Sequence, residues 1–453
     1  MIWLAVASTL IREVARALVV PARLLFYLPR RHHWRRRAQE ALTAASRQDD
    51  GASDDPLARF YQRRRQQRGE RPHLFVSAGE ASGEQHASRL VGAIGATARV
   101  SAFGGSQLAD AGATVRFALS EHAVMGVFGV LKQLPLILRA YADFLRLLRD
   151  DPPDLAVLVD YPGLHMVMAK ACRRRGVPVL HYVAPQYWAW GPWRMRRYRR
   201  AVDATLTILP FETEFFTRQG VPSAYIGHPL LDELHDAPLA AADVADVRAR
   251  RTLVLLPGSR SAEIEANLRG MLQVADVLRG RDPDLRVVVP HKNPRRTERI
   301  RAILEEQGAD RVEHHEGPLG AWLAGAHLVL AKSGTGSLEA CLHGNPTIVV
   351  YQLRGWLASL GYHNILSVPY IAGANLVAGR EVVPEHCFSG DAGWHAVAAD
   401  AVRLWGDDAA RNEHIEALRE VRERLGAPGA TDRVAAITRR FLTDAAPTSA
   451  EPS

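Results

Sequence analysis

The 453-residue sequence predicts an α/β protein with two Rossmann-like domains, whose parallel sheets face each other across a cleft, and a helical N-terminal appendage. Three observations lead to this prediction. Near-continuous apolar runs alternate with helix-forming segments from Arg71 onward, the alternation restarts at Thr252, and the first 70 residues have a different composition. Such apolar runs separated by helices indicate parallel strands covered on both faces. Ligands of these sheets collect at the carboxyl ends of the strands.

The appendage, residues 1–70, holds almost all of the net charge. It contains 14 Arg, no Lys and 7 acidic residues, a balance of +7 out of a formal net charge of +8 for the chain. The rest of the chain is nearly neutral, which argues against a nucleic-acid-binding body. Charged residues and Pro21 interrupt the apolar sequence, and no apolar run reaches the ~20 residues that span a bilayer.

An arginine cluster at 30–37 follows the apolar part of the appendage. An apolar segment followed by arginines predicts an anchor that lies in the plane of an anionic membrane surface. The alternatives are an amphipathic helix packed on the body and a translation start further along the chain. Residues 48–58 are predicted to form a flexible linker.

The body divides into residues 71–240 and 241–443, with a junction expected at 235–250 and a disordered tail at 444–453. The restart of the strand pattern defines this division. Strands are expected at 74–76, 155–159, 177–183 and 204–209 in the first domain and at 252–256, 286–290, 326–330 and 347–351 in the second.

Two turns in the second domain favour a site for a nucleotide diphosphate. Residues 255–264 and 332–339 each contain an apolar run, a small-residue turn and a helix-forming segment. Such turns direct backbone N–H groups and the positive end of a helix dipole at one point. Arg260 could clamp a diphosphate there, and Glu339 could accept hydrogen bonds from ribose hydroxyls. Both turns could instead be ordinary connections with Arg260 and Glu339 in solvent, and neither has the Gly-Lys-Ser/Thr of a P-loop.

The cysteines and acidic pairs indicate no metal site. Cys172, Cys341 and Cys387 are scattered and are expected to be buried thiols in a reducing cytoplasm. Asp282-Pro283-Asp284 precedes a strand and is interpreted as a turn.

The ordered motifs of the chain resemble the lipid-A-disaccharide synthase family from Val76 to Arg380. No single motif is specific, but their order is. The matching motifs include Ala78-Gly79-Glu80-Ala81-Ser82-Gly83, Val159-Asp160-Tyr161-Pro162, His181-Tyr182-Val183-Ala184-Pro185, Gly227-His228-Pro229-Leu230, Leu255-Leu256-Pro257-Gly258-Ser259-Arg260, Ser333-Gly334-Thr335 with Leu338-Glu339, and Asn375-Leu376-Val377-Ala378-Gly379-Arg380.

This resemblance implies an inverting glycosyltransferase of the GT-B architecture that needs no metal or cofactor. The family transfers 2,3-diacylglucosamine from its UDP derivative to lipid X and releases UDP. The implied partners are the UDP-linked acylated glucosamine donor, the lipid monosaccharide phosphate acceptor and an anionic membrane surface, with no nucleic acid. Residues 71–240 would form the acceptor side and residues 241–443 the UDP-sugar side. The implied location is peripheral, on the cytoplasmic face of the inner membrane, and a homodimer and a monomer both stay open.

The resemblance also implies a catalytic set of Asp160, Glu84 and Arg260. Asp160 would be the base that deprotonates the acceptor hydroxyl, with a helix N-cap as the alternative. Glu84 would be a second catalytic carboxylate or an orienting residue, or else an acid that stabilises a helix dipole. Arg260 and the N–H groups from Ser333 to Gly336 would stabilise the leaving UDP. Asn375 and Arg380 would lie in a loop that could reach the diphosphate, and the alternative for Arg380 is an ordinary salt bridge. The implied substrate-binding residues are Gly79, Ser82, Gly258, Ser259, Ser333, Gly334, Thr335, Gly336, Glu339, Asn375 and Arg380.

Several acceptor-side positions depart from the family pattern. Glu84 stands where the family usually has Asp, and the segment from Tyr161 to His165 differs from the usual Ala-Pro-Asp-Phe-Asn. The UDP-side motifs are better kept. A related UDP-sugar glycosyltransferase with another amphiphilic acceptor is therefore an alternative. A UDP-sugar epimerase or a catalytically silent relative is a third reading, because two Rossmann halves alone do not determine chemistry.

Overall fold

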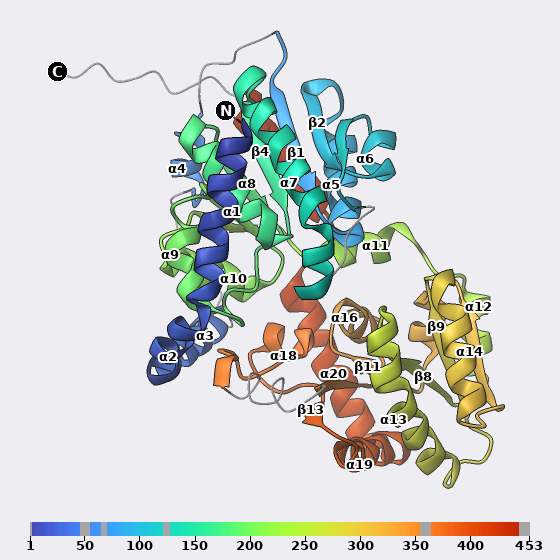
Figure 1. Cartoon of the computed structure of the whole chain (residues 1–453). Helices are drawn as coiled ribbons and strands as arrows, with labels where there is room; N and C mark the ends of the chain where they lie inside the picture. The colour runs from blue at the N-terminus through green and yellow to red at the C-terminus, as the bar shows by residue number, and fades with distance from the viewer. Residues whose placement is uncertain (1, 46–54, 65–69, 121–126, 354–363, 444–453) are drawn as a thin grey trace. The chain divides into compact units, whose positions relative to one another are not determined.

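The computed structural model describes residues 2–45, 55–64, 70–120, 127–353 and 364–443 (Figure 1). The chain forms two compact units, which are described separately. Unit 1 comprises residues 1–232 and 427–453, and unit 2 comprises residues 233–426. The boundary after Asp232 lies next to the predicted junction. The predicted tail and most of the predicted linker lie outside the described residues.

Unit 1 is built on a seven-stranded parallel sheet in the order β3-β2-β1-β4-β5-β6-β7. All residues of β1 and β4 are buried, which explains their continuous apolar sequences. The order of the strands reverses between β1 and β4, and sheets of this type bind ligands at such a reversal. The strands are β1 (His73–Ala78), β2 (Arg99–Gly104), β3 (Thr114–Ala118), β4 (Leu155–Val159), β5 (Val179–Tyr182), β6 (Ala204–Thr207) and β7 (Ser223–Tyr225).

Helices of unit 1 connect and cover these strands (Figure 1). The connections place one helix after most strands, as the alternation in the sequence predicts. The helices are α5 (Ala81–Ile94), α6 (Ser106–Asp110), α7 (Val127–Asp150), α8 (Pro162–Arg175), α9 (Met195–Tyr198), α10 (Pro210–Arg218) and α11 (Pro229–Asp236), the last of which crosses into unit 2.

The C-terminal helix α21 (Ala430–Thr443) belongs to unit 1, whereas the sequence assigned it to the second domain. The Asp232 carboxylate accepts hydrogen bonds from the N–H groups of Gly429, Ala430 and Thr431 and so caps α21. The ring of Phe441 stacks on that of Phe60, with 4.5 Å between centroids. Phe60 and the buried Leu57 lie in or beside α4 (Ala58–Tyr61), so the end of the predicted linker is part of the core.

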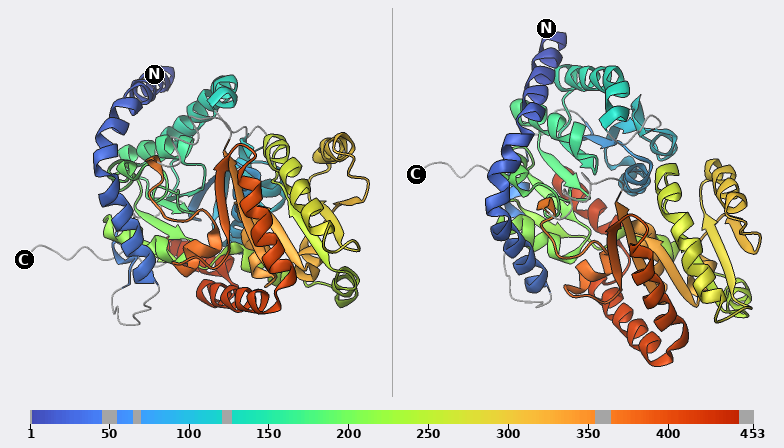
Figure 2. Two further views of the ribbon diagram at one scale, coloured as in Figure 1. Left: turned by 90° about the horizontal axis from the view of Figure 1, so that it is seen from below. Right: turned by 60° about the horizontal axis from the view of Figure 1, so that its bottom comes forward.

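The N-terminal appendage is helical, as predicted, and it packs on unit 1 (Figures 1 and 2). α1 (Ile2–Leu18) lies along α7, and α3 (Arg31–Ala45) packs on α10, with α2 (Val20–Tyr27) between them. Glu13 of α1 forms ion pairs with Lys170 of α8 and Arg197 of α9. These contacts hold the appendage on unit 1, and the membrane anchor stays a prediction. Within the described part of the chain, no helix combines the length and hydropathy needed to cross a membrane.

Unit 2 has a six-stranded parallel sheet in the order β10-β9-β8-β11-β12-β13. Its strands are β8 (Thr252–Leu256), β9 (Arg286–His291), β10 (Val312–Glu316), β11 (Leu328–Lys332), β12 (Thr347–Leu353) and β13 (Glu385–Ser389). Its further helices are α12 (Ala241–Arg248), α13 (Ser261–Arg279), α14 (Thr297–Glu306), α15 (Gly320–Gly325), α16 (Thr335–Leu342), α18 (Gly373–Ala378), α19 (Gly393–Gly406) and α20 (Asp408–Leu425). The two units confirm the predicted pair of Rossmann-like folds. Cys172 and Cys341 are buried, as predicted, while Cys387 is half-buried.

Candidate functional site

Asp160 follows β4 in a sharp turn at the point where the strand order of unit 1 reverses. Asp160 and Tyr161 have φ values of +50° and +47°, and Pro162 then begins α8. Two consecutive non-glycine residues in the left-handed region are uncommon in proteins. Where such strained residues occur, they cluster at functional sites. Gly79, which follows β1, lies against this turn: a Cβ at residue 79 would be 2.2 Å from Cγ of Tyr161. Glycine at 79 therefore lets the Tyr161 ring approach the backbone.

The carboxyl group of Asp160 has an unusual environment. Burial and the nearby negative charge of Glu80 raise its pKa to about 6, although a hydrogen bond from the backbone of Tyr161 opposes the shift. Tyr161, not Asp160, is the N-cap residue of α8, so Asp160 does not have the predicted alternative role of N-cap. A carboxylate with its pKa near neutral is suited to accept a proton during a reaction.

Two buried histidines hold the backbone of Asp160. The Asp160 carbonyl oxygen lies 2.7 Å from Nδ1 of His165 and 3.1 Å from Nε2 of His181. A carbonyl oxygen only accepts, so each of these ring nitrogens donates its hydrogen. Burial lowers the pKa of His165 to about 3 and that of His181 to about 4, which keeps both rings neutral. The opposite nitrogens of the rings then accept hydrogen bonds from the hydroxyls of Ser77 and Tyr198.

Glu84 lies in the first turn of α5, but its carboxylate is bound to other parts of unit 1. It is buried and accepts hydrogen bonds from the N–H of Gly105, at 2.8 Å, and from the hydroxyl of Ser120. Gly105 is the N-cap residue of α6, so Glu84 holds the start of that helix. These contacts are structural. Ser82, also in the first turn of α5, is exposed.

The two turns predicted to bind phosphate lie side by side in unit 2, because β8 pairs with β11. Glu263 links them: its carboxylate lies 2.9 Å from the guanidinium of Arg260 and 3.1 Å from Nζ of Lys332, and it accepts from the N–H of Ser259. Burial raises the pKa of Glu263, but the two cations outweigh this effect and leave the pKa lowered. Gly258 has a φ of +122°, and a Cβ there would be 2.6 Å from Cβ of Glu263.

The turn after β11 leaves fewer free N–H groups than predicted. The N–H of Ser333 donates to the carbonyl of Val350, and the N–H of Gly334 donates to the hydroxyl of Ser337. Thr335 and Gly336 are the first two residues of α16, and their N–H groups have no partner within the described residues. The anion-binding capacity of this turn therefore lies in Thr335 and Gly336.

Glu339 is buried rather than solvated, and its carboxylate lies 3.2 Å from Nζ of Lys292. Lys292 directly follows β9, so the ends of three neighbouring strands, β9, β8 and β11, bring basic groups together in unit 2. Lys292 was not among the site residues predicted from the sequence. Its position after an apolar run of strand length was the signal that could have found it.

Asn375 lies in helix α18, not in a loop as predicted, and it is fully buried. Its amide group donates to the carbonyl of Val383 and to the Glu385 carboxylate, and its amide oxygen accepts from the N–H groups of Val382 and Val383. Arg380 is exposed and forms a salt bridge with Glu420, which was the alternative predicted for this residue. The amide of Asn375 is thus engaged in holding the segment from Val382 to Glu385.

Replacing Asn375 with alanine is expected to destabilise unit 2 by about 3 kcal/mol, because buried N–H and carboxylate groups lose their partners. Arg380→Ala is the matched control: its exposed ion pair contributes less than about 1 kcal/mol. Urea denaturation of both variants measures the difference. Equal stability of Asn375→Ala and the wild-type protein would contradict this role.

Comparison with known proteins agrees with the two-unit fold. The profile described as Lipid-A-disaccharide synthetase matches residues 74–429. The lipid-A-disaccharide synthase of Myxococcus xanthus is 36% identical over 373 residues, covering 80% of this chain and 96% of the relative. The structure of a putative UDP-N-acetylglucosamine 2-epimerase from Listeria monocytogenes has a TM-score of 0.55 at 14% identity, covering 83% of this chain and 97% of that one. The structure of MurG from Acinetobacter baumannii has a TM-score of 0.52 at 13% identity, covering 82% and 99%.

The structural likenesses show the GT-B fold alone, because their sequence identity is low. The sequence similarity shows the family as well as the fold, because the profile matches most of the chain and the alignment covers almost all of the Myxococcus relative. The chain therefore belongs to the lipid-A-disaccharide synthase family of glycosyltransferases.

Proposed function

We propose that this chain transfers 2,3-diacylglucosamine from its UDP derivative to lipid X and releases UDP, a step of lipid A biosynthesis. Membership in the family supports this reaction. The observation that carries the proposal is the partly buried carboxylate of Asp160, which has a raised pKa and lies on a strained turn where a sheet of this type binds its ligands.

In the proposed mechanism, the ionised Asp160 accepts the proton of the acceptor hydroxyl. The hydroxyl oxygen forms a bond to the anomeric carbon from the face opposite the nucleotide, and the bond from that carbon to the diphosphate oxygen breaks. The configuration inverts and UDP leaves with the electron pair. The clamp of His165 and His181 on the Asp160 carbonyl would hold the base in position.

We assign the leaving diphosphate to unit 2. Arg260, Lys332 and the N–H groups of Thr335 and Gly336 supply positive charge and donors at the ends of adjacent strands, and such groups stabilise a developing anion. Gly258 and Ser259 shape the turn that carries Arg260. Glu339, beside Lys292, remains the proposed ribose contact. Within the proposed substrate-binding set, Gly79 and the exposed Ser82 belong to the acceptor side.

Glu84 and Asn375 are better assigned to positioning than to contact with substrate. Both side chains are buried, and their polar atoms are engaged with neighbouring backbone. Arg380, exposed and paired with Glu420, is the remaining candidate for a diphosphate contact from this segment. We further propose a peripheral location on the inner face of the cytoplasmic membrane, because the family's substrates are lipids.

Mass spectrometry of the products tests the proposal. Purified protein incubated with UDP-diacylglucosamine and lipid X is expected to yield the tetraacylated disaccharide phosphate and one UDP per product. An unchanged donor mass with an altered sugar configuration would instead indicate an epimerase. The departures at Tyr161 and His165 favour a second candidate, transfer to another amphiphilic acceptor. Release of UDP with a different acceptor but none with lipid X would establish that candidate.

A further inference from the structure

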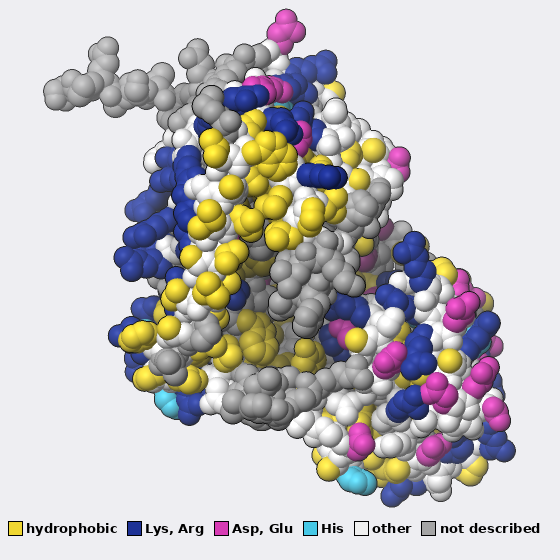
Figure 3. Space-filling view, viewed as in Figure 1, with side chains coloured by type: hydrophobic (Ala, Val, Ile, Leu, Met, Phe, Trp, Pro, Cys, Tyr) yellow, Lys and Arg dark blue, Asp and Glu magenta, His cyan; other side chains and the backbone are white. Residues whose placement is uncertain are grey.

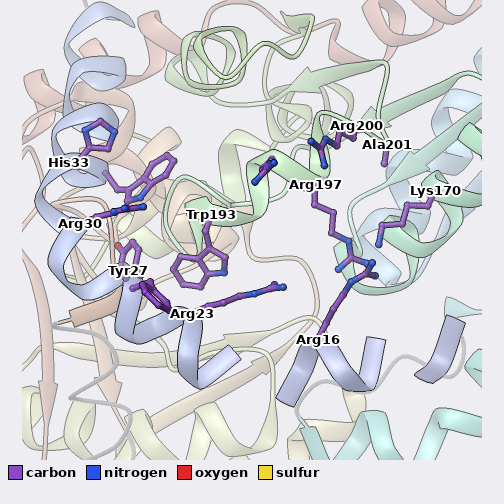
Figure 4. A pocket seen from close by; sticks show the side chains of 13 residues that line it. Arg16, Arg23, Tyr27, Arg30, His33, Lys170, Trp193, Arg197, Arg200 and Ala201 are labelled. Atoms are coloured by element: carbon purple, nitrogen blue, oxygen red, sulfur yellow. The ribbon is translucent and has the colours of Figure 1, made fainter. Parts of the chain in front are cut away.

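A large open pocket lies between the N-terminal appendage and the body of unit 1 (Figure 4). Its volume is about 1090 Å³. Side chains from α1, α2 and α3 line one side, and side chains from α8, α9 and the short helix η4 (Pro192–Arg194) line the other. The appendage precedes residues 74–429, the part of the chain that matches the family. The pocket is therefore a feature of this chain that the family's reaction does not explain.

The lining of the pocket is strongly basic. None of the 13 described lining residues is acidic, and seven are basic: Arg16, Arg23, Arg30, Lys170, Arg196, Arg197 and Arg200. Glu13 engages three of them, namely Arg16, Lys170 and Arg197. Burial and the charge of Arg197 lower the pKa of Lys170 to about 8, even with Glu13 in contact. A single carboxylate thus leaves the pocket with excess positive charge.

The other four arginines, Arg23, Arg30, Arg196 and Arg200, are exposed, and none forms an ion pair with any described residue. They come from both sides of the pocket, two from the appendage and two from the body. Guanidinium groups in such an arrangement suit a phosphate, because each presents paired N–H donors.

The surroundings of the pocket are apolar and aromatic. The rings of Tyr27 and Trp193 are 4.7 Å apart between centroids, and Phe26, which also lines the pocket, is 75% exposed. On α1, large apolar side chains at helical spacing remain exposed, and Figure 3 shows hydrophobic side chains along α1 and α2. These side chains are Trp3, Leu4, Ile11, Val14 and Leu18. Such a stripe next to basic groups is typical of a helix that lies in a membrane interface.

We propose that this pocket binds the phosphate headgroup of an anionic phospholipid while the exposed face of α1 lies among the acyl chains of the same leaflet. A membrane lipid accounts for both the basic pocket and the exposed apolar side chains of α1. Free phosphate or nucleic acid would leave those apolar side chains in water. Tyr27 and Trp193 line the pocket, and amphipathic rings are favoured at a membrane interface. The inference does not depend on the reaction proposed above.

Binding of the purified full-length protein to vesicles tests the pocket. The double variant Arg196→Ala/Arg200→Ala is expected to bind vesicles of phosphatidylcholine with phosphatidylglycerol about 30-fold more weakly than the wild-type protein, because a basic residue near an anionic surface contributes about 1 kcal/mol. The control is Arg281→Ala/Arg419→Ala, which removes the same charge from exposed positions of unit 2 and should change binding little. Unchanged melting temperatures would show that all variants fold.

A second pair of variants tests the apolar face. Ile11→Ser/Leu18→Ser is expected to weaken binding in a way that raised salt does not reproduce, since salt screens only the ionic share. If the control and pocket variants lose the same affinity for vesicles, the pocket is not the binding site. Vesicle binding would then come from a diffuse attraction between the basic protein and the anionic surface. If inorganic phosphate binds the wild-type protein but not the pocket variant, while the two proteins bind vesicles equally, the pocket is a site for free phosphate and the lipid assignment is overturned. The lipid assignment would also be overturned if the pocket variant bound duplex DNA more weakly than the wild-type protein but bound vesicles equally well.

Discussion

Replacing Asp160 with asparagine is expected to abolish transfer while making the protein more stable at neutral pH. The variant loses the base, and loss of general-base catalysis typically lowers turnover by about 10²–10⁴-fold. Affinity for UDP should persist, because the base acts on the acceptor and the groups assigned to UDP belong to unit 2. Isothermal titration with UDP, beside a turnover assay, separates these effects. Residual turnover above about one tenth of the wild-type rate would contradict the role of base.

The expected gain in stability follows from the pKa of Asp160. Burial and Glu80 raise this pKa from 3.8 to about 6 in the folded protein. The folded state therefore binds a proton more tightly than the unfolded state, and the resulting stabilisation is complete below pH 3.8 and is lost as the pH rises through about 6. A shift of this size corresponds to about 3 kcal/mol as an upper bound. Asparagine carries no charge, so the variant gains stability relative to the wild-type protein at pH 7 but not below pH 4.

The same pKa predicts the pH profile of the reaction. The value of kcat/KM should fall as the pH decreases through about 6, because protonation removes the base. Glu84→Gln is a useful comparison: it should lower the melting temperature, since Glu84 holds the start of α6, yet leave the acidic limb of the profile in place. An acidic limb that moves with Glu84 would assign the base to Glu84 instead.

The central strands of both sheets could be predicted because buried parallel strands are continuous apolar runs. β1, β4, β8 and β11 are such strands. The outer strands β3, β10 and β13 are half-exposed and mix polar with apolar residues, so the same signal is weak there. The return of α21 to unit 1 depends on contacts such as Phe60 with Phe441 and Asp232 with Gly429, which join distant parts of the sequence.

The position of Asp160 at a strand end could be predicted for the same reason, but the partners of the polar residues could not. Glu84 contacts Gly105 and Ser120, and Glu339 contacts Lys292, across separations that no local pattern encodes. Asn375 illustrates the difference most clearly. A polar residue in a motif suggested contact with a ligand, whereas its amide group satisfies buried backbone around Val383.

Replacing Arg260 with alanine is expected to lower turnover by about 10²–10³-fold, or 2.7–4 kcal/mol of transition-state stabilisation. The reason is that Arg260 lies at the start of α13, where its guanidinium and the helix N-terminus would share the charge of the leaving diphosphate. The affinity for UDP should fall as well, which distinguishes this variant from Asp160→Asn. The fold should survive, since the side chain is 47% exposed and its ion pair with Glu263 lies at the surface.

Two further variants sharpen this test. Arg269→Ala removes an exposed arginine of the same helix that pairs with Glu306, and it should leave turnover and UDP affinity unchanged. Arg260→Lys keeps the charge but loses the planar fork of donors, so its turnover should lie between those of alanine and arginine. Lys332 also contacts Glu263 and is unchanged in both variants. The loss of turnover therefore measures the contribution of the Arg260 side chain alone. Wild-type turnover in Arg260→Ala would mean that Lys332 and the N–H groups of Thr335 and Gly336 hold the diphosphate without Arg260.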